Sequence, residues 1–234
     1  MILCQRLSEW SANAPELEED IALTNIALDL IGQARSLYQY AGGLGQPPQT
    51  EDELAYLRDE RDWKNVLLVE TPNGNFADTM ARQLFFDAWH LLFLRELEQS
   101  NDATLAAIAA KSVKEATYHL RHSSTWVTRL GDGTEESHQK MQAAIDNYWR
   151  YTGELFETDE LDKQMTALGA GVDTASLAPE WNRMINTVLA NATLQRPEDG
   201  YMATGGRQGL HTTDMGRLLS EMQFLHRSYP GCQW

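Results

Sequence analysis

The stretch from Glu16 to Ala41, ELEEDIALTNIALDLIGQARSLYQYA, decides the fold class. Its apolar residues recur at alternating steps of three and four, which is the spacing of one face of an α-helix. They are Leu23, Ala27, Leu30, Ala34, Leu37 and Ala41. Pro15 before an acidic first turn marks a helix start, and Gly42-Gly43 marks a helix end. The stretch is therefore predicted to form one long helix.

The rest of the chain repeats this pattern, with polar or glycine-rich loops between the periodic segments. Further helices are predicted from Asn75 to about Gln99, over about Ala103–Leu130, from Thr134 to about Glu157, from Pro179, and from about Thr213 to Ser228. Asn75 and Thr134 are the predicted N-terminal caps of their helices, and Pro179 suits a first turn. No segment alternates apolar and polar residues as a half-buried strand does, and no glycine-rich phosphate loop is present. The sequence predicts an all-α fold: one helical domain spanning residues 1–234.

The composition narrows the classes of partner that this protein could bind. The 234 residues carry a net charge of −15, which argues against nucleic acid and anionic membranes as partners because both need a basic face. The acidic surface suits solubility or a basic protein partner. No apolar run reaches the roughly 18–20 residues that a bilayer requires, and no signal peptide is predicted. Cys4 and Cys232 form no metal motif, so a cytoplasmic protein is predicted.

One run, FFDAWHLLFL at residues 85–94, places an acid and a histidine among apolar residues. Helical bundles hold di-iron centres with a Glu from each of two helices and a Glu-x-x-His pair from each of two others. Asp87-x-x-His90 is a shorter-armed version of that pair, but no Glu-x-x-His occurs anywhere in the chain. For each residue alone, a structural role is the commoner interpretation: Asp87 and His90 would pair with polar groups on a neighbouring helix.

Two other helices carry polar residues at similar spacing. Glu115 and His119 lie four residues apart, and His119 shares a face with small residues that indicate close helix packing. Asp29 shares a stripe with Gly32 and neighbouring polar residues, which favours a solvent or subunit face. Each set is open to both a structural and a ligand interpretation.

Taken together, the segments of this chain resemble the C subunits of bacterial phenylacetyl-CoA epoxidases, also called ring 1,2-phenylacetyl-CoA monooxygenases. The matching segments keep their order and spacing over nearly the whole chain. They are QRLSEW, APELEEDIALTNIALDLIGQAR, RDER, LLVETPNGNFADTMARQ, FFDAWH, KEATYHLRHSS, KMQAAIDNYWRYTGELF, GGRQGLHT, SEMQFL and PGCQW. The resemblance implies a ferritin-like four-helix bundle with additional C-terminal helices.

The resemblance also implies a degenerate di-iron site. The catalytic A subunit of such a complex is a related bundle with two Glu-x-x-His pairs. Against that pattern, this chain has the vestigial positions Glu9, Asp29, Gly32, Asp87, Ala116 and His119. One histidine is replaced by glycine and one glutamate by alanine, so no metal is expected in this chain. Asp87 and His119 are predicted to join a hydrogen-bonded or ionic network, and His90 falls outside the ligand set.

The resemblance implies a non-catalytic structural subunit that supports the di-iron catalytic subunit in aerobic phenylacetate degradation. The expected partners are the A subunit, a second copy of this chain, and other components including a reductase. In GGRQGLHT, Arg207 and His211 are candidate contacts to a coenzyme A phosphate or a partner acid, or else ordinary loop residues. Two alternatives stay open: an independently active metalloenzyme of peroxidase or catalase type, and a helical scaffold without an oxygenase partner.

Overall fold

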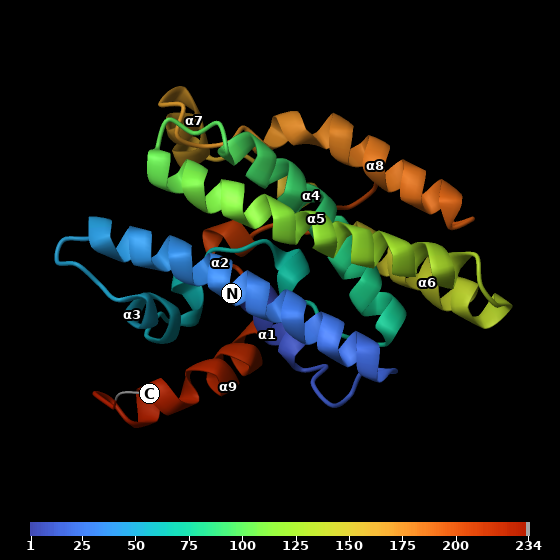
Figure 1. Ribbon diagram of the computed structural model, residues 1–234, viewed down its shortest axis with the longest axis horizontal. Coiled ribbons are helices and arrows are strands. Elements are labelled where there is room, and N and C mark those ends of the chain that lie inside the picture. The colour runs from blue at the N-terminus through green and yellow to red at the C-terminus, as the bar shows by residue number, and fades with distance from the viewer. Residues whose placement is uncertain (233–234) are drawn as a thin grey trace. The chain divides into compact units, whose positions relative to one another are not determined.

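The computed structural model describes residues 1–232. Gln233 and Trp234, the last two residues of the closing motif PGCQW, lie outside the described residues. The described chain forms nine α-helices and five short 3-10 helices, with no strand among residues 1–232 (Figure 1). The all-α, ferritin-like fold class is confirmed.

The chain divides into two compact units. Unit 1 contains Met1–Pro72 together with the residues from Gly205 onward, and unit 2 contains Asn73–Thr204. Each unit is described by itself. The prediction of one domain over residues 1–234 stays a prediction.

Unit 1 is built around α2 (Leu17–Leu44), the helix predicted from residues 16–41. Its α-helices are α1 (Ile2–Ser8), α2, α3 (Glu51–Tyr56) and α9 (Met215–Ser228), and its 3-10 helices are η1 (Glu60–Asp62), η2 (Leu67–Glu70) and η5 (Gly206–Gln208). Helix α1 packs on α2 and η2, whereas α3 packs on α2 and α9. The predicted stripe is buried at Leu23, Ala27 and Leu30, whereas Leu37 and Ala41 are exposed.

The end of α2 lies slightly beyond the predicted one. Gly42 and Gly43 continue the helix, which ends at Leu44. A Cβ atom on Gly42 would lie 2.1 Å from the Gln49 carbonyl oxygen, so only glycine lets the following chain return this close to the helix. The glycine is therefore needed for a close backbone approach inside the last turn.

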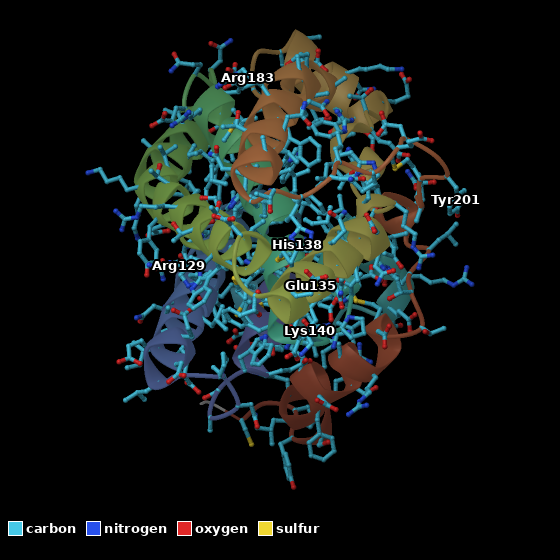
Figure 2. All side chains as sticks on the ribbon, turned by 90° about the vertical axis from the view of Figure 1, so that its right-hand side faces the viewer. Arg129, Glu135, His138, Lys140, Arg183 and Tyr201 are labelled. Atoms are coloured by element: carbon cyan, nitrogen blue, oxygen red, sulfur yellow. The ribbon has the colours of Figure 1, made fainter. Side chains whose placement is uncertain are left out.

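Unit 2 is a helical bundle centred on α4 (Phe76–Leu97) and α5 (Ala103–Gly131). Both helices pack against α6 (Glu135–Trp149) and α8 (Ala178–Asn191). The predicted cap of α4 is confirmed, because the Asn75 side chain accepts from the Ala77 and Asp78 backbone N–H groups. Figure 2 shows side chains of this unit, including Arg129 of α5 and Glu135 and Lys140 of α6, which are exposed.

Helix α6 ends earlier than the predicted Glu157. The Thr152 backbone N–H and hydroxyl both donate to the Trp149 carbonyl oxygen, at 3.0 and 2.8 Å, which tightens the chain out of the α-helix. The chain continues through η3 (Gly153–Phe156), α7 (Glu160–Ala167) and η4 (Thr174–Leu177). The Trp149 ring packs against Phe85 and Trp181 in the apolar core. The buried Trp181 indole donates to the Phe85 carbonyl oxygen at 3.0 Å.

Candidate functional site

A polar seam crosses the core of unit 2 between α4 and α5. We define it by Asp87 and His90 on α4 and by His119 and Ser123 on α5. Asp87, His119 and Ser123 are buried, and the Ser123 hydroxyl donates to Asp87 Oδ2 at 2.8 Å. The α5 face around them is small and buried, with Ala109, Ser112 and Ala116, which allows the two helices to approach closely.

Burial dominates the ionisation of Asp87. It raises the pKa of the Asp87 carboxyl from 3.8 to about 7, and the Ser123 hydroxyl and the Arg82 guanidinium offset only part of this rise. Arg82 is itself buried and donates to Asn73 Oδ1 at 2.8 Å. Asp87 therefore keeps its proton to a higher pH than an exposed carboxyl does, and it accepts a hydrogen bond from a serine.

His90 is a packing residue of the same seam. Its ring lies 5.1 Å from the Phe86 ring and 6.5 Å from the Trp89 ring, between centroids. Its Nδ1 atom is buried and has no hydrogen-bond partner among the described residues. Burial, assisted by the nearby His119, lowers the pKa of His90 from 6.5 to about 3. His90 is thus neutral in the folded chain, and its exclusion from the ligand set stays a prediction.

The donor atoms of unit 2 do not fit a di-iron centre. Ala116 is buried and presents only a methyl group, whereas a di-iron pair in a helical bundle takes about four carboxylates and two histidines. Among residues 1–232, neither unit gathers three or more His, Cys, Asp or Glu side chains that could hold a metal ion. The role of His119 in the seam stays a prediction.

The other three vestigial positions lie in unit 1. Glu9 follows α1 and pairs with Arg6, with Nη1 and Oε1 2.9 Å apart and the Glu9 side chain 43% exposed. Asp29 is half-buried on α2. Gly32 is exposed, and a Cβ atom built on it meets nothing within 4 Å. Asp87 and His119 therefore lie on the paired helices α4 and α5 of unit 2, whereas Glu9, Asp29 and Gly32 belong to unit 1.

A second buried cluster lies in unit 1, and the sequence did not point to it. The Glu70 and His211 side chains are 0% and 1% exposed, and His211 Nδ1 lies 2.6 Å from Glu70 Oε1. Asn65 Nδ2 donates to the same oxygen at 2.8 Å. The Thr212 backbone N–H and hydroxyl donate to Glu70 Oε2 at 2.8 and 2.9 Å. We name this arrangement the Glu70–His211 lock.

Both ring nitrogens of His211 face oxygen atoms inside unit 1. Nε2 lies 3.1 Å from the Trp63 carbonyl oxygen, and Nδ1 lies against the Glu70 carboxylate. Arg6 supports the same residue by donating Nε and Nη2 to the Glu70 carbonyl oxygen, at 3.0 and 2.7 Å.

The Glu70–His211 lock restricts the predicted contact of His211 with a coenzyme A phosphate or a partner acid. Both nitrogens of His211 are engaged inside unit 1, so contact with a phosphate would require breaking the lock. Arg207 is half-buried within η5, and its predicted contact with coenzyme A or a partner acid stays a prediction. The sequence analysis singled out His211 but not its partner Glu70, whose only signal is a charged residue at the end of the apolar run LLV.

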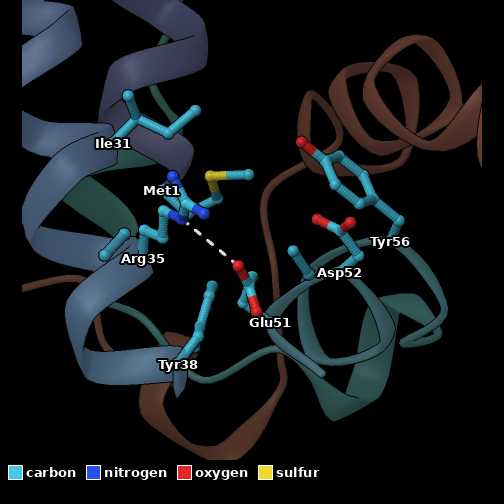
Figure 3. Close-up of a pocket in the computed structure, with 9 residues that line it drawn as sticks. Met1, Ile31, Arg35, Tyr38, Glu51, Asp52 and Tyr56 are labelled. Atoms are coloured by element: carbon cyan, nitrogen blue, oxygen red, sulfur yellow. Dashed lines mark hydrogen bonds and ion pairs between the residues drawn. The ribbon is translucent and has the colours of Figure 1, made fainter. Parts of the chain in front are cut away.

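Unit 1 also contains a cavity of about 270 Å³ between α2 and α3 (Figure 3). Its lining carries two carboxylates, Glu51 and Asp52, against one guanidinium, Arg35. Arg35 Nε already lies 3.2 Å from Glu51 Oε1. This charge balance does not suit the phosphates of a coenzyme A thioester, which need an excess of cationic donors.

The comparisons with known proteins agree with the fold. Residues 1–234 match the family model described as phenylacetic acid catabolic protein. The chain is 52% identical over 234 residues to the C subunit of 1,2-phenylacetyl-CoA epoxidase from Escherichia coli (strain K12), covering 100% of this chain and 94% of that protein. The resemblance to the C subunits is therefore confirmed. Among residues 1–232, no helix combines the length and hydrophobicity that crossing a bilayer requires. The chain belongs to the phenylacetic acid catabolic protein family.

Proposed function

We infer that this chain is a non-catalytic structural subunit of a multicomponent phenylacetyl-CoA monooxygenase in aerobic phenylacetate degradation. The 52% identity to the C subunit of an epoxidase, along the whole chain, supports the complex. The composition of the polar seam supports the structural role, and it is the observation that carries this inference. Asp87 bonds to Ser123, and Ala116 stands where a metal-binding carboxylate is expected.

In the proposed complex, a related catalytic subunit holds the di-iron centre and epoxidises the aromatic ring of phenylacetyl-CoA with dioxygen. A separate reductase supplies the electrons, and the complex works in the cytoplasm. The present chain binds the catalytic subunit, forming a hetero-oligomer, and also associates with a second copy of itself. Its net charge of −15 suits contact with a basic protein surface.

The test is co-expression of this chain with a related catalytic subunit that has two Glu-x-x-His pairs. We expect the two to co-purify, and we expect phenylacetyl-CoA-dependent oxygen uptake only when the catalytic subunit, this chain and the reductase are all present. The matched comparison replaces each Glu-x-x-His histidine of the catalytic subunit by alanine, which should abolish turnover without loss of co-purification.

Three outcomes would contradict the inference. Full turnover by the catalytic subunit and reductase in the absence of this chain would remove its supporting role. Peroxidase or catalase activity of this chain alone, after loading with iron or manganese, would favour an independent metalloenzyme. A scaffold without an oxygenase partner would fail to co-purify.

A further inference from the structure

Helix α2 carries an unusual outward face. Opposite its buried residues lies an exposed row that we name the outer stripe: Leu17, Glu18, Ile21, Asn25, Leu28, Gly32 and Arg35. Leu17, Ile21 and Leu28 are 71%, 54% and 60% exposed. Single exposed apolar residues are ordinary, but three on one face of a helix, here on either side of Asn25, favour contact with a partner.

The outer stripe has a notch at Gly32, toward its C-terminal end. Gly32 is exposed, and a Cβ atom on it would meet nothing within 4 Å, so neither packing nor backbone strain within the described chain requires a glycine there. Glycine in the interior of a helix is unfavourable relative to alanine. A missing side chain beside exposed apolar residues is the arrangement that lets a second helix approach closely.

The outer stripe carries opposite charges at its two ends. Glu18 lies near its N-terminal end and Arg35 near its C-terminal end, and both are exposed. Arg35 uses Nε for Glu51, at 3.2 Å, and a guanidinium has four further N–H groups for a second carboxylate. A surface with acid at one end and base at the other is self-complementary in an antiparallel pair.

We propose that the outer stripe of α2 is the surface through which two copies of this chain pair, antiparallel, about a two-fold axis between Asn25 and Leu28. This inference rests on the self-association in the proposed function and names its surface. The symmetry places Glu18 opposite Arg35 of the second copy. It also places Ile21 opposite Gly32, so that a large side chain fills the notch.

The same symmetry brings the two Leu28 side chains together near the axis, with each Leu28 against Asn25 of the other copy. The apolar contacts thus lie at the centre and the ion pairs at the rim, as in specific protein interfaces. A single pair of helices is small for such an interface, so we expect a dimer of modest affinity.

The test is sedimentation equilibrium of the full chain over about a hundredfold range of concentration. We expect a monomer–dimer equilibrium. Gly32→Lys should raise the dissociation constant about tenfold or more, because it fills the notch. Gly43→Lys is the matched control, since Gly43 is also exposed on α2 with nothing within 4 Å of a Cβ atom, but it lies beyond the paired region.

Charge exchange gives a second measurement. Glu18→Arg and Arg35→Glu should each weaken the dimer, and the double variant should restore it. Glu51→Gln controls for loss of the Arg35–Glu51 pair. A monomer at every concentration, or equal dissociation constants for Gly32→Lys and Gly43→Lys, would overturn the proposal. If Gly32→Lys spares the dimer but prevents co-purification with the catalytic subunit, the outer stripe binds that subunit instead, and the proposed function stands.

Discussion

Asp87 and His90 lie three residues apart on α4, and burial acts on them in opposite senses. The folded state raises the pKa of Asp87 from 3.8 to about 7, so it binds that proton more tightly than the unfolded chain does. The resulting stability is present below about pH 4 and is lost as the pH rises through 7. The folded state lowers the pKa of His90 from 6.5 to about 3. Its contribution is present above pH 6.5 and is lost as the pH falls.

We therefore predict that substituting Asp87 and substituting His90 change the pH dependence of the free energy of unfolding in opposite directions. Asp87→Asn keeps an acceptor for Ser123 but removes the ionisation, so the variant should gain stability relative to the wild type between pH 4 and 8. The gain should be on the order of a few kcal/mol. His90→Gln should gain relative to the wild type as the pH falls from 7 to 4. Urea unfolding across this range measures both.

The control is Asp146→Asn on the exposed face of α6. Because the Asp146 side chain is exposed, this variant supplies the baseline for the effect of an Asp-to-Asn change outside the core. A constant difference between Asp87→Asn and the wild type would show that Asp87 is ionised in the folded core.

At the scale of elements, the Glu70–His211 lock joins η2 to the segment that leads into α9. His211→Ala leaves the Glu70 carboxylate buried with one donor fewer. We predict a loss of about 3 kcal/mol or more in the free energy of unfolding, the usual result of breaking a buried ion pair. Hydrogen exchange should show faster exchange of the α9 amides.

The comparison is Arg217→Ala, which removes an ion pair with Glu221 on the same helix. The side chains of Arg217 and Glu221 are 85% and 68% exposed. That change should cost about 1 kcal/mol or less. Equal protection of α9 in His211→Ala and the wild type would mean that the lock does not hold this helix. A double-mutant cycle with Glu70→Ala then measures the coupling energy.

The long helices were predictable because periodicity and caps are local signals. Asn75 and Thr134 cap α4 and α6 as predicted, and Pro179 lies in the first turn of α8. The short helices α3 and α7 were not predicted, since they hold too few residues for a periodic pattern. The lock was not predictable either, because Glu70 and His211 are 141 residues apart in the chain.

At the scale of the whole molecule, the resemblance to C subunits was recognisable from segments spread over nearly the entire chain, and it is confirmed. The division at Pro72 and Asn73 was not predictable. Both units are helical, so no change of composition marks the boundary.

The metal content of the isolated chain follows from its donor set. We predict well under one iron per chain after anaerobic loading and gel filtration, because Gly32 and Ala116 supply no ligand atoms. Asp87→Ala should leave that value unchanged. Near-stoichiometric iron that is lost in Asp87→Ala would contradict the structural role of the polar seam.

Unit 1 is discontinuous in the chain, since Met1–Pro72 and the residues from Gly205 onward both belong to it. During synthesis, its first part leaves the ribosome long before His211 exists to meet Glu70. Unit 2 is contiguous, from Asn73 to Thr204, so it can fold as soon as it emerges. Helices α1, α2 and α3 can already pack on one another at that stage, but α3 and η1 gain their contacts with α9 only after the segment from Gly205 onward has been made. We therefore expect unit 2 to complete its folding before unit 1 does.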